Sequence, residues 1–112
     1  MTGEREEPAL VRLTGELDIV RRADVHAAFQ AVRNNPRVII DITGVQYLDS
    51  TTIDELFGAT ERARQLGGRL VVVARNQRMV RLLSIAGLTS QLRIADTIVM
   101  AQSIVREPPG PP

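Results

Sequence analysis

The chain has 112 residues, of which 44% are hydrophobic but only 3% aromatic, and 14 basic residues nearly balance 13 acidic ones. This length fits one domain, and a net charge of +1 is too small to attract nucleic acid or an anionic membrane by itself. The chain has no cysteine, and all 14 basic residues are arginines. Disulfides, thiolate chemistry and lysine Schiff bases are therefore excluded.

The two ends of the chain have the composition of loose segments. Residues 1–8 and 106–112 are rich in charge, proline or glycine and poor in apolar groups, so we expect a folded domain over residues 9–105. The acidic start is unlike a signal peptide, and the longest apolar run, residues 70–74, is far too short for a membrane span. These features predict a cytoplasmic protein without membrane insertion.

Four short segments are predicted to be β-strands. Residues 10–15 alternate between two faces and then reach Gly15, which we expect to form a turn. Residues 37–42 ("RVIIDI") and 69–74 ("RLVVVA") are continuous apolar runs of the kind found in strands buried on both faces. A fourth, shorter strand is expected around residues 92–94.

Helical patterns follow these strands, over residues 20–35, 51–68, 76–87 and about 96–104. Gly67 or Gly68 is placed to end the second helix in a left-handed conformation. Arg75, just before the third helix, and Arg78 and Arg81 within it could form a secondary contact with an acidic partner, but a solvated face is the favoured interpretation. The apolar residues expected to face the core are Val20, Ala23, Ala27 and Ala31 with Ala28 and Val32 in the first helix, Ile53, Leu56, Phe57, Thr60, Ala63 and Leu66 in the second, and Met79, Leu82, Leu83 and Ala86 in the third.

The alternation of strands and helices with short links predicts an α/β fold, with a small and mostly parallel sheet of four to five strands joined by right-handed crossovers. The sequence has no phosphate-binding glycine loop and no zinc-binding helix motif. Its single histidine, His26, is interpreted as a surface or half-buried helix residue and not as a base. We therefore expect no metal site and no cofactor.

Three aspartates, Asp18, Asp41 and Asp49, are expected near strand ends, where carboxylates can gather at one edge of a parallel sheet. They could act as acid and base, but strand-end aspartates more often accept hydrogen bonds in turns and caps. The sequence offers no convincing pair of nucleophile and base. The chain is therefore predicted not to be an enzyme.

Three hydroxyl residues, Ser50, Thr51 and Thr52, follow Asp49 at the start of the second predicted helix. Thr51 and Asp54 are spaced as in a capping box, which predicts Thr51 as the helix N-cap. A hydroxyl at a helix N-terminus can also be a phosphorylation site, because phosphate brings about −1.5 to −2 charges to free backbone N–H groups. Both interpretations of Thr51 remain open from the residues alone.

Three stretches together resemble the STAS domains of bacterial anti-sigma factor antagonists: "VRLTGELD", "VIIDITGVQYLDST" and "GGRLVVVARNQRMVRLLSIAGL". The resemblance extends from about Leu10 to Ile104. It implies a small, mostly parallel sheet with one antiparallel edge and helices packed mainly on one side. The family usually has a further N-terminal strand, which is expected to be short or missing here, and a monomer or weak dimer is expected.

The resemblance also implies a function in transcription regulation and the stress response. A family member binds an anti-sigma factor that is also a serine kinase, phosphorylation by that kinase ends the interaction, and a serine phosphatase restores it. The family's acceptor position falls on Thr51, with Ser50 and Thr52 as alternatives, and a family acid beside it falls on Asp18. The resemblance places partner binding at Asp18, Asp49, Ser50, Thr51, Thr52 and Ile53.

The chain departs from the family's motif at two positions near the acceptor. Thr52 stands where the family has glycine, and Asp54 stands where many members have a small residue. A second hypothesis therefore remains open, in which the chain is a constitutive STAS subunit of a signalling scaffold or of a lipid-transport ATPase complex, without a phosphorylation switch.

Overall fold

The computed structural model describes residues 7–87 and 92–107. In this part of the chain, four parallel strands form one sheet in the order β1-β2-β3-β4. The strands are β1 (Ala9–Leu17), β2 (Arg37–Leu48), β3 (Arg69–Val73) and β4 (Arg93–Ala95). The helical segments are the short 3-10 helix η2 (Ile19–Arg21) and the α-helices α1 (Arg22–Ala31), α2 (Ser50–Gln65), α3 (Gln77–Ile85) and α4 (Ile98–Val105).

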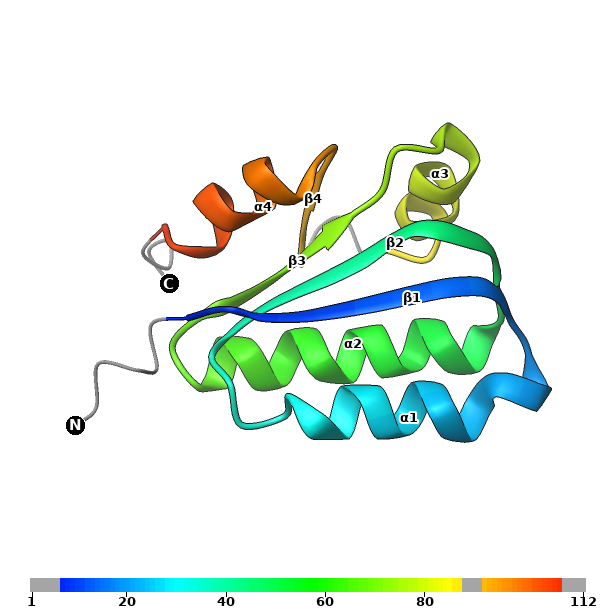
Figure 1. The fold of residues 1–112 in the computed structure, drawn as a ribbon, viewed down its shortest axis with the longest axis horizontal. Helices are drawn as coiled ribbons and strands as arrows, with labels where there is room; N and C mark the ends of the chain where they lie inside the picture. Colours follow the sequence, from blue (N-terminus) through cyan, green and yellow to red (C-terminus); the bar gives the residue numbers. More distant parts are fainter. Residues whose placement is uncertain (1–6, 88–91, 108–112) are drawn as a thin grey trace.

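The helices lie mainly on one side of the sheet, as predicted. Side chains of α1, α2 and α3 share the larger hydrophobic core with the sheet, while α4 forms a smaller core on the opposite face. Figure 1 shows α1 and α2 side by side beneath the sheet and α4 above it. The predicted α/β fold with a parallel sheet is therefore confirmed. Helices cover both faces of the sheet, and its two central strands are buried on both sides.

The antiparallel edge implied by the family resemblance is not found in residues 7–87 and 92–107, where every strand pairing is parallel. The edge position belongs to β1, which pairs along one side with β2. A strand ahead of β1 would have to come from residues before Ala9. Of these, residues 1–6 lie outside the described part of the chain.

The two continuous apolar runs form the central strands. Residues 38–42 of β2 and 70–73 of β3 are all buried, as predicted for strands covered on both faces. In β1, Val11 and Leu13 are buried while Arg12 and Thr14 are exposed. The alternating pattern of residues 10–14 thus correctly predicted one buried face.

Gly15 does not form the predicted turn, because β1 continues through it to Leu17. The register of the β1–β2 pairing shifts on both sides of this position, and Gly15 has a φ of 83°. A glycine with positive φ at a register shift is typical of a β-bulge. The bulge lets β1 run to the same edge of the sheet as β2.

The predicted buried stripe of α1 is wrong. Val25 and Phe29 are buried, whereas Ala23, Ala27 and Ala31 are exposed and Val20 is 82% exposed. The larger side chains bury more apolar area than the alanines do, so the helix turns Val25 and Phe29 toward the sheet. Only the flanking Ala28 and Val32 of the predicted stripe pack partly against the core.

The faces of α2 and α3 were predicted more accurately. Leu56, Thr60 and Ala63 of α2 are buried, although Leu66 is 48% exposed. In α3, Met79 and Leu83 are buried. Arg75, Arg78 and Arg81 are exposed as expected, while Leu82 and Ala86 are only partly buried.

Two adjacent glycines end α2 in a Schellman motif. Gly67 has a φ of 87°, and the N–H groups of Gly67 and Gly68 donate to the carbonyl oxygens of Arg64 and Ala63. A Cβ added at Gly67 would meet no atom within 4 Å, but one added at Gly68 would lie 1.8 Å from the carbonyl oxygen of Pro36. Gly67 is thus needed for its backbone conformation and Gly68 for its lack of a side chain.

We therefore expect Gly68→Ala to lower the free energy of unfolding by about 3 kcal/mol, because a backbone carbonyl must move to make room. Gly67→Ala should cost only about 1 kcal/mol, the strain of a left-handed alanine. Urea denaturation of both variants measures the difference. Equal losses of stability would contradict this account of the α2–β3 junction.

Candidate functional site

The candidate site lies at the carboxyl ends of β1 and β2. We call this end of the sheet, with Asp18 and residues 49–54, the Asp49 edge. Leu17 and Leu48 are paired in the last register position, and the backbone N–H of Asp49 donates to the carbonyl oxygen of Leu17 over 3.2 Å. Asp18 and Asp49 directly follow these strands. The edge therefore brings together two of the three aspartates that the sequence singled out.

Asp49 holds the start of α2. Its Oδ1 accepts a hydrogen bond of 2.9 Å from the backbone N–H of Thr52, and its Oδ2 lies 3.6 Å from Nη2 of Arg22 in α1. The hydrogen bond from Thr52 and the positive charge of Arg22 outweigh partial burial and lower the pKa of Asp49. No sequence pattern indicates Arg22, which lies 27 positions before Asp49 and approaches it only because α1 and α2 pack side by side.

Asp18 has a more local role in the structure. Its Oδ1 accepts a hydrogen bond of 3.0 Å from the backbone N–H of Val20, which caps η2. Within the described residues, its carboxylate makes no hydrogen bond to Thr51. Asp18 therefore shapes the turn after β1, at the same end of the sheet as the candidate acceptor.

Thr51 is not the helix cap, which corrects the prediction from the capping-box pattern. The helix begins at Ser50 with Asp49 as its N-cap, so Thr51 lies within the first turn. Aspartate is a stronger N-cap than threonine, and the extended backbone of Asp49 points its carboxylate at the free N–H groups. One carboxylate therefore does what the capping box assigned to Thr51.

The three hydroxyl residues have three different environments. Ser50 is exposed, Thr51 is partly buried, and Thr52 is 3% exposed. Thr52 turns inward because it stands at the third helical position, four residues before the fully buried Leu56. Ser50 and Thr51 can thus be reached from solvent, and Thr52 cannot.

Charged side chains surround this helix start. Asp54 is exposed, while Glu55 accepts from the ring of His26 in α1. His26 is itself exposed, in agreement with its interpretation as a surface or half-buried helix residue. The contact ties α1 to α2 close to the candidate acceptor.

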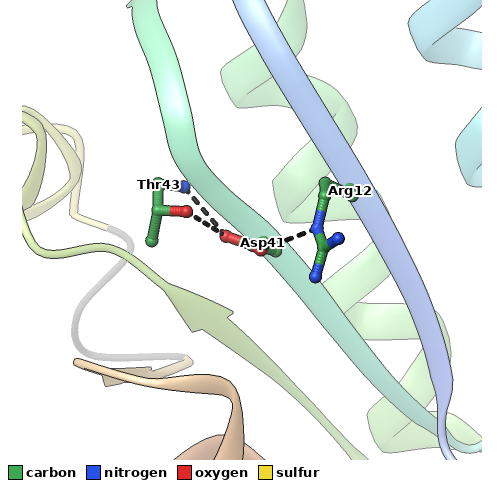
Figure 2. A network of polar contacts seen from close by, with 3 residues as sticks. All are labelled: Arg12, Asp41 and Thr43. Carbon is green, nitrogen blue, oxygen red and sulfur yellow. Dashed lines mark hydrogen bonds and ion pairs between the residues drawn. The ribbon is translucent and has the colours of Figure 1, made fainter.

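Asp41 does not join the other two aspartates, because it lies within β2 and not at its end. Its side chain is 6% exposed and accepts from Nε of Arg12 over 3.1 Å and from the N–H and Oγ1 of Thr43 over 2.9 and 2.8 Å. Figure 2 shows the contact from Arg12 of β1 to Asp41 of β2 and the contacts between Asp41 and Thr43 within β2. Burial alone would raise the pKa of Asp41, but the hydrogen bonds from Thr43 and Arg12 outweigh it and lower this pKa. Asp41 therefore links β1 to β2 and is not placed for acid–base chemistry at the edge.

The described part of the chain shows neither a metal-binding cluster nor a membrane-spanning helix. Over residues 7–87 and 92–107, no three His, Asp or Glu side chains gather as a metal ion would require. Nor does this part of the chain contain a helix that is both long and apolar enough to cross a bilayer. What the edge presents is a capped helix start with two accessible hydroxyl groups.

The chain is therefore a small parallel α/β domain with accessible hydroxyl groups at the start of one helix. The family model described as "Mlab, STAS domain" matches residues 1–98. An anti-sigma-B factor antagonist from Listeria monocytogenes is 31% identical over 84 residues, which cover 73% of this chain and 74% of that protein. The chain therefore belongs to the STAS domain family and, within it, to the anti-sigma factor antagonists, as the three sequence stretches predicted.

Solved structures agree with this assignment. An anti-sigma factor antagonist from Mycobacterium paratuberculosis is 28% identical, with a TM-score of 0.78 over 89% of this chain and 86% of that one. The Bacillus cell fate determinant SpoIIAA in its phosphorylated form has a TM-score of 0.63 at 22% identity, over 90% of this chain and 93% of that one. The second likeness concerns the fold alone.

The capping role of Asp49 leads to a direct test. We expect Asp49→Ala to lower the free energy of unfolding by about 1 kcal/mol at neutral pH, whereas Thr51→Ala should change it by less than about 0.5 kcal/mol. Because the pKa of Asp49 is lowered in the folded state, its contribution is present above the unfolded pKa of about 3.9 and is lost as the pH falls through the folded value. Urea denaturation at pH 7 and below pH 4 measures both effects. A larger loss for Thr51→Ala than for Asp49→Ala would restore Thr51 as the cap.

Proposed function

We propose that this chain binds an anti-sigma factor that is also a serine kinase, and that phosphorylation of Thr51 by this kinase releases it. The observation that carries the proposal is that the Thr51 hydroxyl group is accessible and, within the described residues, not used in a hydrogen bond. Thr51 lies in the first turn of α2 and is only partly buried. Capping by Asp49 leaves this hydroxyl group free, and the exposed Ser50 is the alternative acceptor.

A phosphate on Thr51 would change the character of this edge. It would bring about −1.5 to −2 charges to a surface that already carries Asp49 and the exposed Asp54. Arg22, 3.6 Å from Asp49, is the cation in place to offset part of that charge. A partner that fits the neutral hydroxyl group would meet a bulky anion, and the loss of complementarity favours dissociation.

The proposed contact surface consists of the accessible residues of the edge, which are Asp18, Asp49, Ser50, Thr51 and Ile53. The buried Thr52 supports this surface from beneath through its backbone hydrogen bond to Asp49. The named function of the Listeria relative, antagonism of the anti-sigma-B factor, supports a partner of the same class here. That SpoIIAA, a protein of the same fold, has a phosphorylated form supports the switch by fold alone.

We infer that the chain acts by binding and not by catalysis, and that it works in the cytoplasm, where a serine phosphatase would return it to the binding state. Asp18 and Asp49 support this inference, because each carboxylate already accepts a backbone hydrogen bond that holds a helix start. Neither aspartate is placed as a free general base.

One observation favours the alternative of a constitutive docking subunit. Asp49 and Asp54 place two carboxylates around the candidate acceptor, and both would repel a phosphate. In that case, the same edge would hold a permanent partner in a signalling scaffold or a lipid-transport ATPase complex.

The two functions are separated by incubating the chain with magnesium, ATP and each anti-sigma factor kinase of the same genome, and by mapping added phosphate through mass spectrometry. We expect one phosphate on Thr51, its loss in Thr51→Ala, and its retention in the matched variants Ser50→Ala and Thr51→Ser. Calorimetry should show at least tenfold weaker binding once the phosphate is present.

Two results would contradict the proposal. A stable complex without phosphate on any hydroxyl group would favour the constitutive subunit. If the unphosphorylated chain bound no kinase of this class, the proposed function would fail.

A further inference from the structure

A groove of about 550 Å³ lies between α3 and the point where β2 leads into α2. Its apolar lining includes Tyr47, Leu48, Ile53, Met79, Leu82 and Ile85. Core was the favoured prediction for Met79 and Leu82, and the structure shows that they also line this groove. The sequence could not reveal it, because residues 47–53 and 79–85 meet only in the fold.

The rim of the groove is unusually apolar for an exposed surface. Tyr47 is 53% exposed and Ile85 is 77% exposed, on opposite sides of the groove. Single exposed apolar residues are common, but a hollow bordered by several of them is typical of an interaction site. The groove therefore has the features of a surface that another apolar group covers.

The charge of the groove is entirely positive. Arg78 and Arg81 line it, and both are exposed and form no ion pair within the described residues. Among the residues that line it there is no aspartate or glutamate. A segment that fills this groove should therefore combine apolar side chains with carboxylates.

We propose that the groove binds an acidic, apolar segment of the same anti-sigma factor that docks at the Asp49 edge, an inference that rests on the proposed function. The two surfaces are continuous, because Ser50 and Ile53 belong to the edge and also line the groove. One partner can therefore cover both. Its acidic segment lies against Arg78 and Arg81 while its kinase site faces Thr51.

Other occupants fit this groove less well. A second copy in a two-fold contact would bring Arg78 and Arg81 against the same arginines, and like charges at an interface disfavour association. The two ends of the described chain lie away from the groove. They are at the amino ends of the strands, where Ala9 pairs with Val38 and Glu107 contacts Arg69. In Figure 1, these ends lie at the left and α3 at the right.

The charges of the combined surface also define the orientation in which a partner can bind. Asp18, Asp49 and Asp54 make one end of the combined surface acidic, and Arg78 and Arg81 make the other end basic. A partner with the opposite arrangement can dock in one orientation only, because rotation would place like charges together. The basic end thus helps to position the kinase at Thr51.

The test measures the affinity of the unphosphorylated chain for the kinase by calorimetry. The double variant Arg78→Glu/Arg81→Glu should bind at least tenfold more weakly, and Ile85→Ser should also lose affinity. The matched control is Arg33→Glu/Arg106→Glu, which makes the same change in net charge at exposed positions away from the groove and should stay within twofold of the wild type. Melting temperatures check that each variant is folded.

The outcomes separate this inference from the proposed function. Wild-type affinity in the folded Arg78→Glu/Arg81→Glu variant would overturn the groove while leaving the antagonist function in place. A wild-type chain that bound no kinase would overturn the proposed function and the inference with it. A dimer that sedimentation detects in the wild type and not in Ile85→Ser would assign the groove to a second copy instead.

Discussion

The candidate site depends on one carboxylate, that of Asp49. It caps α2, pairs with Arg22 of α1 and follows a residue, Leu48, that is paired with the end of β1. Three elements are therefore fixed relative to one another at a single point. Because Asp49 accepts a hydrogen bond from the backbone N–H of Thr52, the hydroxyl groups of Ser50 and Thr51 are not needed as helix caps. The accessible state of Thr51, on which the proposed switch rests, is a consequence of this arrangement.

The remainder of the fold places this point at a surface that a partner can cover. The helices α1 and α2 lie on one face of the sheet and α4 on the other, so the carboxyl ends of β1 and β2 stay uncovered. Away from this point, in the middle of the sheet, Asp41 and its partners join β1 to β2. Asp41 therefore stabilises the sheet, whereas Asp49 both stabilises the start of α2 and belongs to the proposed contact surface. Asp41 is buried within the sheet, whereas Asp49 lies at its edge beside the α3 groove.

The fold was largely predictable, because the continuous apolar runs at residues 38–42 and 70–73 indicate buried parallel strands and the glycine after α2 marks its end. The stripe of α1 was not, since its alanines have the helical period but bury too little area to outweigh Val25 and Phe29. At the site, the capping-box pattern favoured Thr51 as the N-cap, because the spacing of residues does not show whether Thr51 or Asp49 accepts the helix N–H hydrogen bond. Arg22, Tyr47 and Ile85 could not be found at all, because their neighbours come from distant parts of the chain.

The central claim, that the Asp49 edge and the α3 groove together form the partner surface, is tested most directly by nuclear magnetic resonance. Unlabelled anti-sigma factor kinase would be added to the ¹⁵N-labelled, unphosphorylated chain, and the amide signals followed residue by residue. We expect the changes to concentrate in residues 46–54 and 76–85, while the signals of α4 stay almost unaffected. Changes confined to α4 and β4, on the opposite face, would contradict it.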